Sequence, residues 1–404
     1  MAKSDFLFLL VLAAIPIQLG KYFWPDFAFV LGIPIDYQAI IIYLSDFIIL
    51  GYLFFFLMEN FILKIKNIKK VFKGYKYFLI ALLALNFYLI INAQFISKSP
   101  AVSWWLSLRF FTLSLFSFFA AITLSKGNLY KWSLWVIGFS FIWQSLLIFL
   151  QFIFQKSLGL WFLGERSFDS STVGIAHMQI FGNLYLRPYG TFPHPNVLAA
   201  YLIVSLIILR SKILTILVGF AAIGLTYSKA AYLALVTFPI FLLKSLRTLL
   251  LASIFLLILV WVFLKQLPQS QFASIAERLV LVQASLDIAF SHPIFGVGSG
   301  NFIAQLAKLN LISIGEIRLL QPVHNVFLLI LAENGLLGLF LFLFLLLAIA
   351  KKADSPIKIA LFVSILIFAT FDHFLWTLQQ GRLLFWVATA YILAQPDQKT
   401  QKTQ

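Results

Sequence analysis

The sequence predicts an all-α, polytopic membrane protein, and three properties of its composition carry this prediction. Of the 404 residues, 62% are hydrophobic and only 11% are charged, and the mean hydropathy is +0.98. In soluble domains about a quarter of all residues are charged, so this chain has too few polar side chains to cover a soluble core. Disordered chains are poor in aromatic residues, which here make up 17% of the sequence. Soluble globular proteins and disordered proteins are therefore excluded.

Twelve apolar stretches predict about twelve transmembrane helices. A span needs about 20 mostly apolar residues, and its backbone must form hydrogen bonds within the segment, which favours helices. The expected spans lie near residues 5–20, 38–58, 77–96, 104–124, 132–155, 196–210, 212–227, 229–243, 247–264, 324–350, 357–376 and 381–395. No convincing cleavage site follows the apolar run 6–17, so it is interpreted as a first span rather than a signal peptide. The whole chain, 1–404, is expected to form a single integral membrane domain.

The distribution of basic residues predicts the orientation of these spans. Short cytoplasmic linkers of membrane proteins are enriched in Lys and Arg. When the lysine-rich linker 64–76 is placed inside, the alternation of twelve spans puts all the remaining short basic linkers inside as well. Both termini are then cytoplasmic. Much of the formal charge of +16 therefore lies beside anionic lipid headgroups, and it does not indicate nucleic acid.

Two long segments are expected on the outer side, a first outer loop at residues 156–195 and a second at 265–323. Structureless loops of this length are usually functional. Within the second loop, residues 275–290 predict a helix that lies at the membrane interface. All five histidines are expected outside or at outer helix ends: His177, His194, His292, His324 and His373. This grouping on one face indicates a site that faces outward.

Three ordered motifs lie in the second half of the chain. Residues 187–202 read RPYGTFPHPNVLAAYL, and Arg278 is followed by SHPIFGVGSGNF at 291–302. Residues 324–341 read HNVFLLILAENGLLGLFL. In this order and within a twelve-span layout, these segments resemble the O-antigen ligase / O-antigen polymerase family of bacterial membrane glycosyltransferases. The resemblance is strong from about 185 to 345, and elsewhere it rests on the layout.

The resemblance implies a GT-C-like fold and an activity. Members of the family transfer a glycan from an undecaprenyl-diphosphate carrier to an acceptor on the outer face of the bacterial inner membrane. The implied reaction is inverting and metal-independent, with no cofactor. The implied partners are the lipid-linked glycan donor, a lipid or glycan acceptor such as the lipid A core, and membrane lipids. The matching functional positions are Arg187, Arg278 and His324.

The chemistry of these residues suits that reaction. Arginine offers a fork of donors that pairs with phosphate oxygens, so Arg187 and Arg278 suit a diphosphate leaving group. His324 is expected either to take the proton of the acceptor hydroxyl, because the pKa of histidine is near neutral, or to orient the diphosphate. Further substrate contacts are expected from Lys229, His194, Asn196 and Asn325. Family members commonly carry arginine where this chain has Lys229, and lysine keeps the charge but loses the fork.

Five of these residues also have a structural interpretation, which for His324 is a position at the N-terminus of a helix with a solvated ring. Arg187 and Lys229 are also interpretable as side chains that reach lipid headgroups, and Arg278 as part of the solvated face of an interfacial helix. His194, between two prolines, is equally consistent with a structural role.

Other polar features are expected to have structural roles. The glycines of 296–300 predict a tight turn, because no strand precedes them as a dinucleotide motif requires. Asp372 and His373 are expected to support the outer face, without further ligands at metal spacing. The carboxylates Asp46 and Glu333 are expected to face the bundle interior, with Glu333 bonded to a neighbouring helix.

Three functions remain open at this point. An O-antigen ligase is favoured over a polymerase of the same family by the compact chain. A transporter of lipid-linked glycans is the alternative from another class, although transporters place ionisable groups near the membrane midplane. A non-catalytic scaffold is the remaining option.

Overall fold

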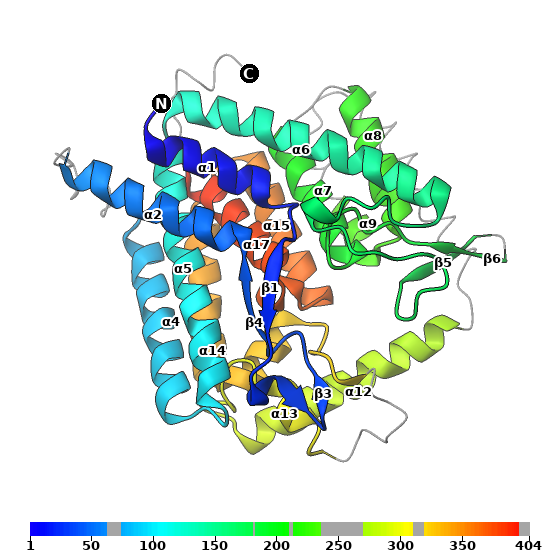
Figure 1. The fold of residues 1–404 in the computed structure, drawn as a ribbon. Coiled ribbons are helices and arrows are strands. Elements are labelled where there is room, and N and C mark those ends of the chain that lie inside the picture. The colour runs from blue at the N-terminus through cyan, green and yellow to red at the C-terminus, as the bar shows by residue number, and fades with distance from the viewer. Residues whose placement is uncertain (63–73, 181, 210–212, 236–269, 310–318, 396–404) are drawn as a thin grey trace.

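Helices make up most of the computed structural model, which describes residues 1–404 except 63–73, 181, 210–212, 236–269, 310–318 and 396–404. The described helices are α1 (Lys3–Ala14), α2 (Leu44–Ile62), α4 (Lys76–Phe95), α5 (Pro100–Leu124), α6 (Gly127–Phe154), α7 (Pro195–Leu209), α8 (Ile213–Thr226), α9 (Lys229–Leu235), α12 (Ser270–Ser291), α13 (Phe302–Leu306), α14 (Val326–Ala350), α15 (Pro356–Phe371), α16 (Phe374–Thr377) and α17 (Gln379–Leu393). In Figure 1, α4, α5 and α14 stand side by side, and α6 runs at a steep angle to them near one end.

The structure supports a helical membrane protein. Four described helices, α4, α5, α6 and α14, are long and apolar enough to cross a membrane. Shorter apolar helices occur at Pro195–Leu209, Thr215–Thr226 and Pro356–Phe371. The expected span 247–264 and most of the expected span 229–243 lie outside the described residues. The total of twelve spans and the GT-C-like arrangement therefore stay predictions.

The all-α prediction needs a correction near the N-terminus. The expected first span, 5–20, is helical only as far as Ala14, and strand β1 (Gly20–Phe23) follows. The expected second span becomes helical only at Leu44, because residues 40–43 form strand β4 (Ile40–Tyr43), antiparallel to β1. The run of three isoleucines and a tyrosine in β4 is typical of a strand, and hydropathy alone did not distinguish it from the start of a span.

Two further hairpins lie among the described residues. Strands β2 (Phe29–Val30) and β3 (Ile33–Pro34) are joined through Leu31 and Gly32, which both have positive φ, as a tight type I′ turn requires. Strands β5 (His177–Ile180) and β6 (Asn183–Leu186) pair within the first outer loop. That loop therefore has local structure of its own.

The helices bring the predicted inner and outer segments to different ends. Lys126 forms an ion pair with Asp5, 2.8 Å between Nζ and Oδ1, and Lys351 lies over the ring of Tyr77. At the far end of α4, the backbone N–H of Lys98 donates to the carbonyl of Val297. The basic linkers at 126 and 351 thus lie by helix ends away from the second outer loop, which agrees with the predicted grouping. The side of the membrane on which each end lies stays a prediction.

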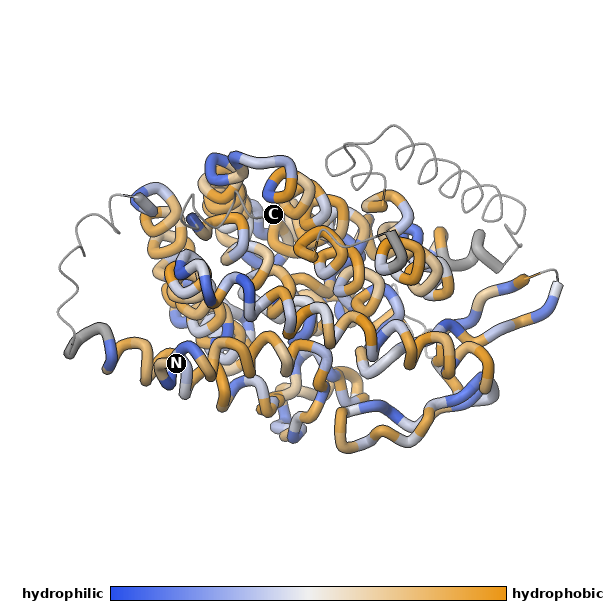
Figure 2. The backbone as a smooth tube through the Cα atoms, turned by 90° about the horizontal axis from the view of Figure 1, so that it is seen from above, coloured by the Kyte–Doolittle hydropathy of each residue, from blue (hydrophilic) through white to orange (hydrophobic). Residues whose placement is uncertain are grey.

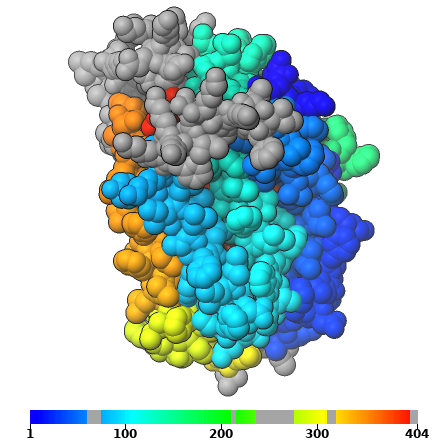
Figure 3. Space-filling model, turned by 90° about the vertical axis from the view of Figure 1, so that its left-hand side faces the viewer, coloured from blue at the N-terminus to red at the C-terminus, as the bar shows by residue number. Residues whose placement is uncertain are grey.

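A large apolar surface covers the outside of these helices. Figure 2 shows that the helices are mostly hydrophobic along their length. The face in Figure 3 is built by α2, α4 and α5, with α14 beside them. Phe87 of α4 is 66% exposed and Phe340 of α14 is 65% exposed. Apolar surface of this extent suits contact with lipid.

Helix α14 is broken at Gly335, and the loop before α13 forms hydrogen bonds with the backbone groups that the break frees. Gly335 has φ 65°, outside the helical range. At the break, the N–H of Gly298 donates to the carbonyl of Glu333 at 2.7 Å, and the N–H of Leu336 donates to the carbonyl of Pro293 at 2.8 Å. Backbone groups freed inside a membrane helix need such partners. The loop therefore acts as a backbone partner for the broken helix.

The predicted glycine turn and the predicted role of Glu333 are confirmed here. Gly296, Gly298 and Gly300 all have positive φ, which glycine adopts at little cost. A Cβ at Gly296 would lie 2.4 Å from the backbone of Glu333, so only glycine fits this approach. The buried Glu333 carboxylate accepts a bond from the N–H of Phe302, which begins α13.

The helix expected at 275–290 is present as α12, and it is longer than expected. Its residues Leu281, Ala284 and Ile288 are buried in a core cluster shared with α13 and α14, whereas Leu279 is exposed. Spacings of three and four residues place these buried side chains on one helix face. Its position at the membrane interface stays a prediction.

Candidate functional site

A polar cavity of about 520 Å³ lies where the N-terminal strands, the first outer loop, α12 and α17 meet. Five of the seven predicted site residues line it: Arg187, His194, Asn196, Arg278 and His324. The fold thus brings the three sequence motifs to one place, although long stretches of chain separate them. Lys229 and Asn325 do not form part of the wall.

The cavity gathers positive charge. All five arginines in the described part of the chain line it: Arg109, Arg166, Arg187, Arg278 and Arg382. The wall also holds the carboxylates Asp36, Glu277 and Asp372, which offset part of this charge. A cleft lined mainly by charge of one sign concentrates ligands of the opposite sign. The arrangement therefore suits an anionic ligand.

Arg187 is held in place by two hydrogen bonds. Its Nε donates to the carbonyl of Thr226 and its terminal NH2 nitrogen donates to Asn196 Oδ1, both at 2.8 Å. The other end of the Asn196 amide donates to Asp372 Oδ2, also at 2.8 Å. These bonds use two of the five N–H donors of the guanidinium. Arg187 is thus oriented at the wall by a chain of polar contacts that ends at Asp372.

The segment before α7 folds against buried glutamines of α6. The side-chain oxygen of Gln151 accepts bonds from the backbone N–H groups of Tyr189 and Gly190, and its nitrogen donates to the carbonyl of Gly190. Gly190 has positive φ. Buried backbone groups must find partners, and Gln151 supplies them where no helix or strand does. This support fixes the backbone between Arg187 and His194.

His194 is a half-buried, neutral histidine. Its Nδ1 accepts a hydrogen bond from the backbone N–H of Asn196 at 3.1 Å, so the ring proton lies on Nε2. Burial, and then the positive charge of Arg187, lowers the pKa of His194 to about 3. The structure therefore gives His194 a local structural bond and also places it on the cavity wall.

His324 lies beside Asp372 and His373. The rings of His324 and His373 meet edge to face, 5.1 Å between centroids, and the ring of Tyr37 also meets that of His373 edge to face, at 5.4 Å. One ligand atom from each of His324, Asp372 and His373 lies within 4.8 Å of the others. The expectation that Asp372 and His373 have no further ligand nearby is wrong, because sequence spacing did not predict that His324 would join them.

Burial sets the charges in this cluster. It lowers the pKa of His324, and it lowers the pKa of His373 to about 3. Burial alone would raise the pKa of Asp372, but the neighbouring histidines and the bond from Asn196 hold it near 2. At neutral pH the cluster therefore contains one carboxylate and neutral imidazoles. A neutral His324 is in the form that accepts a proton.

Arg278 of α12 faces the same group of residues. Its charge acts on Arg187, His324 and His373, lowering the pKa of each beyond the larger effect of burial. Lys229 lies in the field of both Arg278 and Arg187, although it is outside the cavity wall. The positive charges of three separate segments therefore come close together. A substrate contact by Lys229 stays a prediction.

Asn325 positions its neighbour His324. Its Oδ1 accepts the backbone N–H of Leu328 at 2.9 Å and so caps α14, and its Nδ2 donates to the carbonyl of Thr370 at 3.0 Å. These bonds tie the start of α14 to the end of α15, where Asp372 follows. They place His324 next to the Asp372 carboxylate. A direct role of Asn325 in substrate binding stays a prediction.

Arg109 is a cavity residue that sequence reasoning missed. It is buried within α5, where it pairs with Asp46 at 3.1 Å and donates to Gln379. The pair confirms that Asp46 faces the interior. A charged residue inside an apolar span indicates function or ion pairing. Arg109 lies within the expected span 104–124, so its position in the sequence could have identified it.

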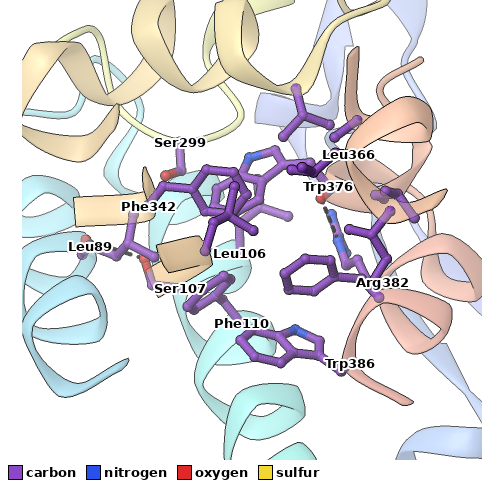
Figure 4. A pocket seen from close by; sticks show the side chains of 16 residues that line it. Leu89, Leu106, Ser107, Phe110, Ser299, Phe342, Leu366, Trp376, Arg382 and Trp386 are labelled. Carbon is purple, nitrogen blue, oxygen red and sulfur yellow. Dashed lines mark hydrogen bonds between the residues drawn. The ribbon is translucent and has the colours of Figure 1, made fainter. Parts of the chain in front are cut away.

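Arg382 joins the polar cavity to a small apolar one. Its Nε donates to the carbonyl of Trp376 at 2.7 Å, and Figure 4 shows it beside the aromatic rings of Phe110, Trp376 and Trp386. These rings line an apolar pocket of about 30 Å³, which shares Arg382 with the polar cavity. Arg382 is therefore a further cavity residue that the three sequence motifs do not include.

The fold and the cavity define a helical membrane protein with a cationic, histidine-containing site. The family model described as O-antigen ligase matches residues 197–343, and this confirms the resemblance drawn from the motifs. The match includes Arg278 and His324, and it begins just after Asn196. No curated protein matches the chain. This part of the chain is therefore similar to O-antigen ligases.

Proposed function

We propose that this protein transfers a glycan from an undecaprenyl-diphosphate carrier to an acceptor hydroxyl, as an O-antigen ligase, on the outer face of the bacterial inner membrane. The observation that carries the proposal is the convergence of Arg187, Arg278 and His324 on one cavity. The family match supplies the reaction class. The proposed acceptor is a hydroxyl of the lipid A core or a similar molecule, and the compact 404-residue chain is the reason for preferring a ligase to a polymerase.

The proposed reaction is a single displacement. The acceptor oxygen attacks the anomeric carbon as the bond from that carbon to the diphosphate oxygen breaks, so that the anomeric configuration inverts. The hydroxyl proton passes to His324, whose lowered pKa keeps it neutral and ready to accept. The lipid diphosphate leaves with the electron pair. Arg187 and Arg278 stabilise its developing charge, which is usually the largest catalytic contribution.

The arginines supply the counter-charge that a metal ion provides in other phosphate chemistry. We therefore propose a transfer that needs no metal. The alternative role of His324, orienting the diphosphate by hydrogen bonding, places the same residue at the same site. The two roles differ in the pH dependence of the chemical step, because only a base must be unprotonated.

A polymerase is the second candidate from the same family, and it would use another lipid-linked repeat unit as acceptor. A transporter of lipid-linked glycans is the alternative from another class. Transporters bind substrate near the midplane on discontinuous helices. The cavity here is lined largely by loops, strands and helix ends, which favours the enzyme.

The test is a transfer assay with purified protein, a glycosylated undecaprenyl diphosphate and separate acceptors, with and without chelator. Mass spectrometry of the product identifies the acceptor. We expect Arg187→Ala, Arg278→Ala and His324→Ala each to abolish transfer. The control His177→Ala, at a half-exposed residue outside the cavity wall, should leave it intact. Full activity of His324→Ala would remove the base assignment. Loss of activity with chelator would contradict a metal-independent reaction, and vesicle uptake without transfer would favour the transporter.

A further inference from the structure

We propose that His324, Asp372 and His373 form a binding site for a divalent transition-metal ion such as Zn²⁺, and that the bound ion inhibits glycan transfer. The inhibitory part rests on the proposed function, because it assumes that His324 must be free to accept a proton. The binding part rests on the geometry of the three side chains alone.

The three ligand atoms are close enough to converge on one ion. They lie within 4.8 Å of one another, and His373 Nε2 is 4.0 Å from Asp372 Oδ1. Tetrahedral zinc, with bonds of about 2.0–2.1 Å, places its ligands about 3.4 Å apart. Side-chain movements on the order of one ångström therefore bring the atoms to bonding distance. His324 Nδ1 is buried and has no hydrogen-bond partner among the described residues.

The hydrogen bonds around His373 leave a lone pair facing Asp372. The hydroxyl of Thr377 donates to the carbonyl of His373, so it accepts from His373 Nδ1 at 2.7 Å. The proton of the neutral ring then lies on Nδ1, and Nε2 presents a lone pair towards a carboxylate oxygen. Two acceptors facing each other across 4.0 Å are stabilised when a cation lies between them. A hydroxyl bonded to the other ring nitrogen is also the usual outer-shell support of a metal-binding histidine.

The carboxylate is oriented for the same purpose. Asp372 Oδ2 accepts from Asn196 Nδ2, and Oδ1 accepts from the backbone N–H of His373, each at 2.8 Å. Each oxygen has a second lone pair that remains for a cation. Ligating carboxylates in metal sites are held in the same manner. Asp372 is thus a preoriented ligand.

The ligand types select the class of ion. Two imidazoles and one carboxylate favour zinc and neighbouring transition metals over magnesium and calcium, which prefer oxygen ligands. All three residues line the 520 Å³ cavity, so the remaining coordination positions of a bound ion would be open to water or to a phosphate oxygen. A metal bound to His324 uses the lone pair that the proton would take. Inhibition is therefore the expected effect.

The first experiment measures binding without any substrate. Full-length protein in lipid nanodiscs is stripped with chelator and titrated with Co²⁺, whose visible absorption reports coordination by protein ligands. We expect one Co²⁺ per chain that Zn²⁺ displaces, and a rise in melting temperature of the wild type with Zn²⁺. His373→Gln and Asp372→Asn should weaken binding by at least about tenfold, because even loss of an outer-shell partner costs that much. The matched control, His177→Ala, should bind as the wild type does.

The second experiment measures transfer with and without Zn²⁺, each variant being compared with its own metal-free rate. We expect Zn²⁺ to inhibit the wild type and His177→Ala, and to inhibit His373→Gln only at concentrations at least about tenfold higher. Absence of Co²⁺ binding to the wild type would overturn the site. Transfer that saturating Zn²⁺ leaves unchanged or accelerates would overturn the inhibition. Metal binding by a protein that transfers no glycan would instead remove the proposed function and leave the site standing.

Discussion

The side-chain amide of Asn196 donates a hydrogen bond to Asp372 across 2.8 Å, and so joins the start of α7 to the segment that follows α15. The same amide accepts a bond from Arg187. One residue therefore orients the cation proposed to bind diphosphate and the carboxylate beside His324. Asn196 therefore links Arg187 to the cluster of Asp372, His373 and His324 by hydrogen bonds.

Asn196→Ala should lower kcat/KM for glycan transfer by about 10- to 100-fold. A hydrogen bond to a charged group contributes about 1.5–3 kcal/mol, equivalent to about 10- to 100-fold. The substitution removes one bond from Arg187 and one from Asp372, but Thr226 still holds Arg187 and the backbone N–H of His373 still holds Asp372, so we expect a loss no larger than that of one full bond. Steady-state kinetics with the lipid-linked donor measures the effect. Asn183→Ala, on the exposed strand β6, is the matched control. Equal activities of the two variants would show that the Asn196 bonds do not orient the site.

Arg187→Lys should behave more like Arg187→Ala than like the wild type. Lysine keeps the charge, but it cannot bond Thr226 and Asn196 at once in a planar fork and still present donors to a phosphate. We expect a loss of about 100-fold, equivalent to about 2.7 kcal/mol, as for removal of one donor that stabilises developing charge. The assay is single-turnover transfer at saturating donor. Near-full activity of the lysine variant would mean that charge alone suffices.

Gly335→Ala should destabilise the protein by about 2 kcal/mol or more. Its φ of 65° disfavours any side chain, and a Cβ would lie 2.3 Å from the backbone of Ile294. Thermal unfolding in detergent, followed by circular dichroism, measures the change. Gly51→Ala in α2 is the control, because its Cβ would meet only Leu7, at 3.6 Å. A melting temperature unchanged in both variants would contradict the close approach at the break.

The stability of the protein should fall as the pH drops from about 6.5 towards 3. The pKa of His194 is about 3 in the folded state and near 6.5 when the residue is exposed. The unfolded chain therefore binds a proton in this range that the folded chain excludes, so acid favours unfolding. Melting temperatures across this range should decline less steeply for His194→Asn than for the wild type. His177→Ala should follow the wild type, and parallel curves for all three proteins would argue against a His194 that is neutral in the folded state.

The sequence motifs predicted the central part of the site, because Arg187, Arg278 and His324 each stand in a recognisable local pattern. The fold confirmed that they meet at one cavity. The sequence predicts only a supporting role for Asp372 and His373, because their approach to His324 depends on how α14 and α15 pack, as the bond from Asn325 to Thr370 shows. Contacts between segments that are far apart in the chain produce no periodic pattern in a single sequence, so they could not be predicted from it.

The N-terminal segment shows a different limit. Residues 40–43 are apolar enough to extend a membrane span, and they form strand β4 because β1 is available to pair with them. Hydropathy measures how well a residue suits lipid, and it does not report a partner strand. Strand β1 supplies Tyr22 to the cavity, and the segment that leads into β4 supplies Asp36 and Tyr37. These contributions became visible only in three dimensions.

The gathering of all described arginines on one cavity has a consequence for turnover. Such a cavity holds most tightly the ligand with the greatest negative charge. In the proposed reaction that ligand is the spent carrier, because departure of the sugar leaves its terminal phosphate with one more ionisable oxygen than the donor has. Release of the carrier is therefore expected to be the slow step. The rate in a cell would then follow how quickly other proteins remove and recycle that carrier from the membrane.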